Sequence, residues 1–307
     1  MEKIMNNAPQ KAKKKRRKIS VKNAICNLII ACFVLAGVGM LAYPTAANWY
    51  NTAHATRAVA DYNNVMNDMS ETDFQTMLDG AVAYNANLLK MIDRFEPDEE
   101  THNWYCDSLD ITGTGIMGYI EIPKISVKLP IYHGTEETTL MVAVGHLEGS
   151  MLPVGGIGNH VVMSGHSALP SAKLFTDLAK LEVGDSFSLM VLGNELTYRV
   201  REINTVLPEQ YEYFDVDPNA DLVTLMTCTP YGVNSHRLLV TGERIYEPGG
   251  DENIELESPS QTNLKEDYAE PRRDLQILLG VGIAIIIAAF SRTARMIAGA
   301  RNKKKGR

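Results

Sequence analysis

Two long apolar runs, one near each end of the chain, stand out in its hydrophobic pattern and predict helices that cross a membrane. The first run, residues 24–42, is apolar except for Asn27, and the second, residues 275–291, carries no charged side chain. At about 1.5 Å per residue, ~20 residues match a hydrocarbon core of roughly 30 Å, so the second run lies at the short limit. We therefore expect transmembrane segments at 23–43 and 275–291. A cleaved signal peptide is the alternative for the first, although its apolar run is longer than such peptides use.

The chain between these runs begins with a helical pattern. Residues 44–93 lack strand alternation, and the run SETD from Ser70 to Asp73 is typical of a capping box that opens a helix. Apolar residues then follow near helical spacing: Phe74, Met77, Leu78, Ala81, Leu88 and Ile92. We expect these helices to lie on the domain that follows, a membrane-proximal stalk being the alternative.

The pattern changes to strands after an acidic segment. Residues 94–115 contain a proline and several acids and glycines, and predict an irregular segment. From 116 to 246, seven or eight short β runs such as MGYIEI, HVVMSG and LVTLMTC are separated by turn residues. This spacing predicts an all-β domain, either a closed barrel or a sandwich. The polar residues 247–274 predict a linker to the second span.

Charge is segregated along the chain, and this segregation predicts a topology. Residues 1–22 hold nine Lys or Arg and one acid, and residues 292–307 hold seven and no acid, so both basic tails are expected in the cytoplasm. Residues 23–290 hold 14 basic and 36 acidic residues, a net charge of −22, and their domain is expected outside the cell. So acidic a domain would repel a phosphate backbone, which excludes nucleic-acid binding as the main function.

Cysteine usage points to a candidate nucleophile outside the membrane. Cys26 and Cys32 fall within the first predicted span, where they need no role beyond packing. Cys106 and Cys228 are too few for a disulfide framework, and no CxxC pair suggests a zinc site. These two cysteines either form one bridge, or one of them carries chemistry.

Cys228 ends the strand pattern LVTLMTC, directly before the turn sequence TPYG. A thiol at a strand end lies at the rim of a barrel, although a buried structural cysteine is the commoner alternative. A nucleophilic thiol also needs a base or a cation nearby. Arg237 begins the next apolar strand nine positions later, which is enough for a turn and an antiparallel return, so the two can be neighbours. An ion pair with one of the many acids is the alternative role of this arginine.

Three histidines are candidates for the base, and spacing does not choose among them. His160 opens the run HVVMSG, and His166 follows its end. His236 stands beside Arg237 on a predicted strand, so these two side chains point to opposite faces. His166 is slightly favoured, because its position between a glycine and a serine at a strand end suits the rim of a barrel.

Long segments of the β region resemble sortases, the extracellular cysteine transpeptidases of Gram-positive bacteria. Residues 224–244 (TLMTCTPYGVNSHRLLVTGER) resemble the signature around the sortase nucleophile, and residues 160–178 (HVVMSGHSALPSAKLFTDL) resemble the segment with the sortase histidine. The runs GYIEIPKISVKLPIYHGT and GHLEGSMLPVGG are similar to the strands and turn before it. The likeness covers residues 116–246 and is greatest to class C, the pilin polymerases, in which a second span after the catalytic domain is typical.

This resemblance implies a closed β-barrel in which Cys228 is the nucleophile, His166 the catalytic histidine and Arg237 the residue that steadies the substrate and the oxyanion. It implies no metal and no other cofactor. The implied enzyme is a membrane-bound cysteine transpeptidase that cleaves an LPxTG-like sorting signal between Thr and Gly. It would join the signal, through an acyl-thioester, to a lysine amine of a pilin subunit, so its partners would be LPxTG-bearing pilin or surface proteins.

Two other functions remain compatible with the sequence. A housekeeping sortase would use the same chemistry to anchor surface proteins to peptidoglycan. A catalytically silent membrane scaffold would bind sorting signals without cleaving them.

The chain departs from the usual class C pattern in two places. Many members have His-Arg-Gly-Leu-Pro where residues 166–170 of this chain read His-Ser-Ala-Leu-Pro. The class C lid often carries an Asp-Pro-aromatic anchor, for which the segment upstream of Gly118 offers only the run DRFEP at 93–97. We expect residues 94–115 to form a lid or a packed linker, and a disulfide between Cys106 and Cys228 is a further hypothesis.

Overall fold

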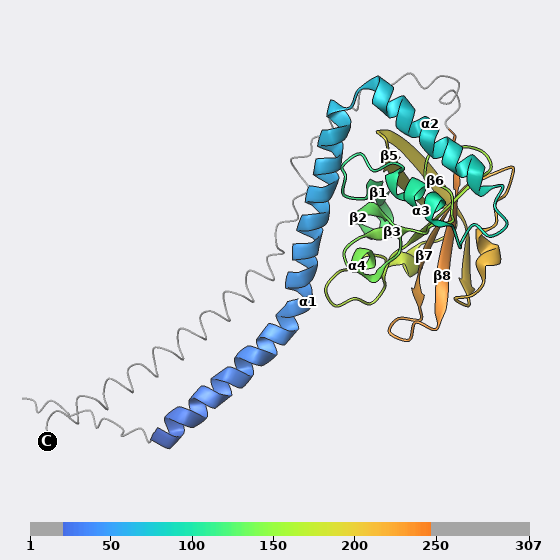
Figure 1. Ribbon diagram of the computed structural model, residues 1–307. Coiled ribbons are helices and arrows are strands. Elements are labelled where there is room, and N and C mark those ends of the chain that lie inside the picture. The colour runs from blue at the N-terminus through green and yellow to red at the C-terminus, as the bar shows by residue number, and fades with distance from the viewer. Residues whose placement is uncertain (1–20, 247–307) are drawn as a thin grey trace, which may run out of the picture. The chain divides into compact units, whose positions relative to one another are not determined.

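Eight strands within residues 116–244 close into a β-barrel, which confirms the all-β prediction (Figure 1). The computed structural model describes residues 21–246, so the predictions for residues 1–20, the linker at 247–274, the span at 275–291 and the tail at 292–307 lie outside the described residues. Around the barrel the strands follow the order β1-β2-β3-β4-β7-β8-β6-β5. The chain divides into two compact units, and the unit at 43–271 contains the whole barrel.

Within residues 21–246, three helices precede the strands of the barrel along the chain. The helices before the barrel are α1 (Val21–Asp68), α2 (Glu71–Leu88) and α3 (Glu99–Asp107). The strands are β1 (Ile116–Ile122), β2 (Val127–His133), β3 (Val144–His146), β4 (Asn159–Ser164), β5 (Ser186–Val191), β6 (Asn194–Val206), β7 (Asp221–Thr229) and β8 (His236–Arg244). Short helices join them: η1 (Pro123–Ile125), α4 (Glu137–Leu140), η2 (Leu178–Lys180) and η3 (Tyr211–Phe214).

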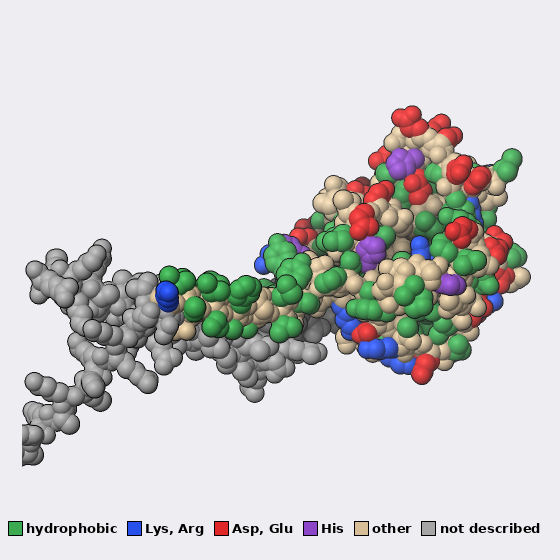
Figure 2. Space-filling model, turned by 90° about the horizontal axis from the view of Figure 1, so that it is seen from below, with side chains coloured by type: hydrophobic (Ala, Val, Ile, Leu, Met, Phe, Trp, Pro, Cys, Tyr) green, Lys and Arg blue, Asp and Glu red, His purple; other side chains and the backbone are tan. Residues whose placement is uncertain are grey.

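The first part of α1 has the character of a membrane span. Large apolar side chains such as Ile30, Phe33 and Leu41 are exposed along it, and Figure 2 shows hydrophobic side chains around this part of the helix. The stretch Ile25–Asp68 is long and apolar enough to cross a membrane. An apolar surface of this kind on a long helix is stable in hydrocarbon and costly in water.

The second part of α1 packs on the barrel. Tyr62 is buried, donates its hydroxyl to the carbonyl of Met117 (3.1 Å) and accepts the N–H of Leu192 (2.8 Å). Because one phenol bridges β1 and the turn between β5 and β6, the helix is fixed to the barrel by polar as well as apolar contacts. The expectation that the helical region lies on the β domain is confirmed.

α2 begins at the predicted cap. The Ser70 hydroxyl accepts the N–H of Asp73 (3.2 Å) and donates to its carboxylate (2.7 Å). The predicted apolar face is buried at Phe74, Ala81 and Leu88. Ile92 does not belong to this face: the helix ends at Leu88, and Ile92 is fully exposed in the turn that follows.

The sequence predicts an irregular segment at 94–115, but part of this segment is helical. Residues 99–107 form α3, because Asp98 caps the helix by accepting the N–H of Thr101 (2.9 Å). Glu99 and Glu100 in the first turn favour the positive end of the helix dipole. These acidic residues, which looked like a polar loop, therefore start a helix.

β7 lies between β4 and β8 in the barrel. It pairs in parallel with β4 and antiparallel with β8. Val223 and Leu225 lie fully buried in the main core of the barrel. The alternate positions face outward, where Met226 packs against an outer cluster of four buried residues: Val162, Val206, Phe214 and Leu239.

Candidate active site

Cys228 and Arg237 face each other across two neighbouring strands. Cys228 is the last but one residue of β7, Arg237 is the second residue of β8, and the two pair directly in the antiparallel register. Directly paired residues of an antiparallel sheet present their side chains on one face, with Cβ atoms about 4.5–5.5 Å apart. Both side chains are half-buried. The predicted proximity of this thiol and this guanidinium is confirmed.

The segment that carries His166 is hydrogen-bonded to β7 on its N-terminal side. Gly165 donates its N–H to the carbonyl of Met226 (3.0 Å) and accepts the hydroxyl of Thr227 (2.7 Å). Only a glycine fits here, because an added Cβ would lie 2.7 Å from the ring of Phe175. The chain therefore runs close beside β7 as it reaches the histidine.

The segment is also hydrogen-bonded to β7 on the C-terminal side of His166. The Ser167 hydroxyl donates to the backbone carbonyl of Cys228 at 2.7 Å. The carbonyl of His166 itself accepts the N–H of Phe175 (3.1 Å), which closes the loop that follows. His166 thus lies between two residues that are both tied to the strand end with the thiol.

Arg237 is held by its own turn rather than by an acid. Its Nη1 donates to the carbonyls of Asn234 (3.3 Å) and His236 (3.2 Å). Among the ion pairs of residues 21–246, none includes Arg237. The described structure therefore does not show the alternative of a surface ion pair, and no carboxylate there occupies the guanidinium on the face of Cys228.

One carboxylate reaches His166. Glu137 is the first residue of α4, in the connection between β2 and β3, and its Oε2 lies 3.3 Å from Nε2 of His166. The Glu137 side chain is 74% exposed, whereas that of His166 is 23% exposed. The site thus combines a thiol, an imidazole, a guanidinium and one accessible carboxylate, which is a set suited to acyl transfer.

Comparison with known proteins decides the family. Residues 120–245 match the family described as "Sortase domain". The crystal structure of sortase C1 from Streptococcus agalactiae is 44% identical to this chain, with a TM-score of 0.60, and the match covers 62% of this chain and 100% of that one. The chain belongs to the sortase family.

Two further similarities define this sortase more closely. Sortase A of Bacillus anthracis is 32% identical over 130 residues, 42% of this chain and 60% of that protein, so the match spans less than two thirds of this relative. The Clostridium perfringens sortase C solved with the C-terminal cell wall sorting motif is 38% identical, with a TM-score of 0.56, and is covered to 100%, against 63% of this chain. The structural neighbours thus include class C sortases, within a family of cysteine transpeptidases.

The other two candidate histidines have structural partners in this sortase. His160 is buried, its Nδ1 lies 2.7 Å from the carbonyl of Asp215, and its Nε2 lies 2.9 Å from the Thr224 hydroxyl. Burial lowers the pKa of His160, which favours the neutral form of the ring. It pairs with Leu222, six residues before the thiol, or roughly 20 Å along the strand.

His236 is adjacent to the site but turned away from it. It pairs with Thr229 and follows the alternation of the strand, so it faces the side opposite to Arg237, as the sequence predicts. Its Nδ1 lies 2.9 Å from the hydroxyl of Ser235 in the turn. Of the three histidines, His166 is the one followed by Ser167, whose hydroxyl donates to the backbone carbonyl of Cys228.

Cys106 is separate from this arrangement. Cys106 and Cys228 are both free thiols, so the hypothesis of a disulfide between them is not supported. The Cys106 sulfur lies 3.6 Å from Nε2 of His102 within α3. Burial, followed by the charges of Glu148 and Asp107, raises the pKa of the Cys106 thiol, which lowers its reactivity.

The start of the predicted lid segment lies on the outer cluster. The ring of Phe95 packs against Tyr211 (5.4 Å between centroids) and Phe214 (6.4 Å), and Arg94 donates to the carbonyl of Phe214 (2.6 Å). Trp104, by contrast, packs edge-on against buried Tyr84 at 5.5 Å. Phe95 therefore packs on the outer cluster that also contacts Met226, two residues before Cys228 on the same face of β7, whereas Trp104 packs on Tyr84.

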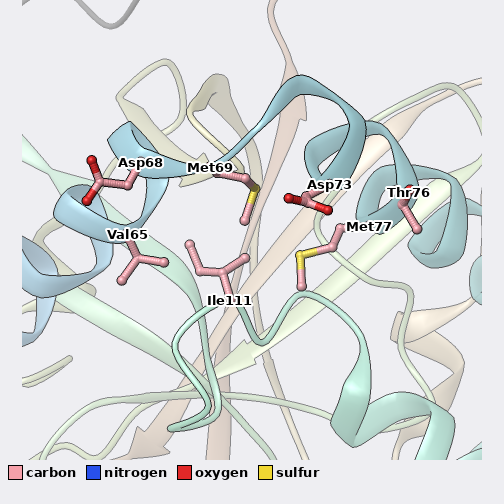
Figure 3. A pocket seen from close by; sticks show the side chains of 7 residues that line it. All are labelled: Val65, Asp68, Met69, Asp73, Thr76, Met77 and Ile111. Atoms are coloured by element: carbon pink, nitrogen blue, oxygen red, sulfur yellow. The ribbon is translucent and has the colours of Figure 1, made fainter.

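The barrel unit also has a cavity of about 540 Å³ away from these residues (Figure 3). Its lining comes from the end of α1, the start of α2 and the segment before β1: Val65, Asp68, Met69, Asp73, Thr76, Met77 and Ile111. None of the four site residues contributes to it. The chemistry of these four side chains, and not the cavity, defines the candidate active site. In residues 21–246, no group of three or more His, Cys, Asp or Glu is arranged to hold a metal ion.

Proposed function

We propose that this sortase is a class C cysteine transpeptidase. It cleaves an LPxTG-like sorting signal between Thr and Gly and joins the threonine, through an acyl-thioester, to a lysine amine of a pilin subunit. The observation that carries the proposal is the pairing of Cys228 with Arg237 beside a loop that holds His166 at the same strand end. The similarity to the class C sortases supports the class, and the sorting motif bound to one of them supports the substrate.

In the first step of the proposed mechanism, Cys228 attacks the carbonyl of the threonine as a thiolate. His166 protonates the amine of the leaving glycine, so that the C–N bond breaks and the acyl-thioester remains. Arg237 donates hydrogen bonds to the developing oxyanion. Such a donor contributes about 3 kcal/mol to stabilisation of the transition state.

In the second step, the acceptor amine attacks the thioester. A C–N bond forms, the C–S bond breaks, and the electron pair stays on the Cys228 sulfur. His166, neutral after the first step, takes a proton from the attacking nitrogen, which restores the starting pair. The same histidine serves both steps, because the second is chemically the reverse of the first with another amine.

The proposed topology follows from the basic tails and the two apolar runs. Residues 23–43 and 275–291 cross the membrane, residues 44–274 lie outside, and both termini are cytoplasmic. The catalytic barrel at 116–246 would then meet its partners at the outer face of the membrane. Residues 94–115 would act as a partial lid, in which Phe95 packs on the outer cluster on the same sheet face as Cys228.

The test uses the full-length chain in detergent micelles with a labelled LPxTG peptide and two acceptors. One acceptor is a lysine-containing pilin peptide, and the other is a peptide with the free amine of a peptidoglycan cross-bridge. Mass spectrometry should find the threonine joined to the lysine ε-amine. Transfer to the cross-bridge amine alone would identify a housekeeping sortase. Binding of the peptide without cleavage by either route would identify a scaffold.

A further inference from the structure

We propose that Glu137 is the binding site for the ammonium group of the acceptor substrate. This inference rests on the proposed function, because it assigns a place to the second substrate of the same site. The finding behind it is the contact of 3.3 Å between Oε2 of Glu137, in α4, and Nε2 of His166, which sets a carboxylate against the imidazole.

His166 marks the side of the thioester on which amines bind. It must protonate the leaving amine in the first step and deprotonate the attacking amine in the second, so both nitrogens pass through one position. Arg237 lies on the other side of Cys228, on β8, where it can hold the carbonyl oxygen. The site therefore has a cation, Arg237, for the acyl oxygen on one side. On the other side it has an anion, Glu137, beside the histidine that exchanges protons with the amine.

Glu137 is available for such a ligand. Its side chain is 74% exposed, so a protein substrate can reach it. Within residues 21–246, His166 is the sole hydrogen-bond or ion-pair partner of the Glu137 carboxylate, and no lysine or arginine pairs with it. A lysine is an ammonium ion near neutral pH, and a nearby carboxylate is the group that attracts it. The acidic domain between the two predicted spans adds a long-range attraction of the same sign.

The carboxylate acts on binding and not on the bond changes. The acceptor arrives as an ammonium ion, releases one proton to water and attacks as the neutral amine. Its second proton passes to His166 while the C–N bond forms and the C–S bond breaks with its electron pair on sulfur. Since the bound ammonium must lose a proton before it attacks, Glu137 should lower the KM of the acceptor without raising kcat.

Glu137 has one competing role, which is to orient the His166 ring. An orienting carboxylate would affect every acceptor equally, because all of them depend on the histidine. An ammonium site affects only acceptors that carry a positive charge. The two roles are separated by comparing a lysine-containing peptide with hydroxylamine, which is uncharged at neutral pH, and with water.

The test measures transfer from the acyl-enzyme of the full-length sortase in detergent, for the wild type and three variants. Glu137→Gln should raise the KM of the lysine peptide about fivefold relative to that of hydroxylamine, equivalent to roughly 1 kcal/mol, the upper end for an exposed ion pair. Glu137→Asp should recover part of this loss. Glu136→Gln is the matched control, because it removes the same charge from an exposed neighbour that has no hydrogen bond or ion pair to His166.

Two outcomes would overturn the proposal. If Glu137→Gln lowers transfer to lysine, hydroxylamine and water by one common factor, Glu137 acts through His166 and is a positioning residue. If Glu136→Gln has the same effect as Glu137→Gln, the cause is the general negative field and not a site. Failure of the proposed function is visible in the wild type alone, which would then either form no thioester or transfer the acyl group to the cross-bridge amine and not to lysine.

Discussion

The hydroxyl of Ser167 donates a hydrogen bond of 2.7 Å to the backbone carbonyl of Cys228, so the residue after His166 is tied to the residue with the thiol. Gly165, on the other side of the histidine, is tied to β7 through both its N–H and its carbonyl. The backbone of β7, the strand with Cys228, therefore holds the segment that carries the His166 imidazole. Many class C sortases have an arginine in the place of Ser167, so this chain uses a different residue beside its histidine.

Ser167→Ala should lower kcat while it leaves the KM of the sorting peptide nearly unchanged. The lost hydrogen bond contributes about 0.5–1.5 kcal/mol, and a small displacement of a catalytic group costs more in rate than in stability, so we expect a fall of about tenfold. Ser167→Thr keeps a hydroxyl and should restore most of the rate. Kinetics with a labelled peptide provide the measurement.

The control for this variant is Ser188→Ala in β5, a strand that pairs with β1 and β6 and not with β7 or β8; it removes a hydroxyl that bonds to Thr197 at 3.0 Å. It should leave kcat as in the wild type. Equal losses of kcat in the two variants, or no rescue by threonine, would show that Ser167 contributes to stability and does not position His166.

Arg237→Lys tests whether the planar guanidinium is needed. A lysine keeps the charge but loses the fork of donors, so turnover should fall about 10²–10³-fold if Arg237 holds the oxyanion. Arg201→Lys is the comparison, because Arg201 is an exposed arginine that pairs with Glu243 at 3.5 Å. Such a pair contributes about 0–1 kcal/mol, and its loss should leave turnover unchanged. Wild-type turnover in Arg237→Lys would reject the catalytic role.

Phe95→Ala tests the partial lid. Phe95 packs on Tyr211 and on Phe214, which belongs to the outer cluster. An aromatic contact of this kind is worth about 0.5–1.5 kcal/mol, so opening should become severalfold more frequent. The rate of alkylation of Cys228 should rise by that factor without a change in Tm. Trp104→Ala is the contrast, because Trp104 packs on buried Tyr84 and its loss should lower Tm. Unchanged labelling in Phe95→Ala would make the segment a linker.

His146 predicts a loss of stability in mild acid. Burial lowers the pKa of this fully buried ring to about 4, and its Nε2 lies 2.8 Å from the carbonyl of Met151. The unfolded chain, with a pKa of about 6.5, binds the proton first, so stability is full above pH 6.5 and falls as the pH decreases towards 4. By pH 5 the loss should be about 2 kcal/mol. Thermal unfolding between pH 7 and 5 measures it, and a flat profile would contradict the assignment.

Several features of the fold could be predicted because they depend on local pattern. The cap at Ser70 and the strand alternation around Cys228 are visible in a few adjacent residues, and a spacing of nine residues suffices to bring Arg237 beside the thiol. α3 was missed because its residues are acidic and polar, so the cap at Asp98 had no apolar face to support it. Ile92 was misplaced because apolar spacing continues past the end of α2.

The site was less predictable than the fold. Spacing left His160, His166 and His236 open, because the choice depends on which loop lies against β7. No sequence pattern pointed to Glu137, because it is one exposed acid among many, 29 residues before the histidine that it contacts. The catalytic roles of His166 and Arg237 stay predictions until they are measured.

The central claim is that Cys228 forms the acyl-thioester, and mass spectrometry of the intact full-length protein tests it directly. After incubation with an LPxTG peptide and rapid acid quench, the wild type and Cys106→Ala should carry the acyl fragment, and fragmentation should place it on Cys228. Cys228→Ala should carry none and keep the Tm of the wild type. An adduct on Cys106, whose thiol has a raised pKa, or an adduct that persists in Cys228→Ala, would contradict the account.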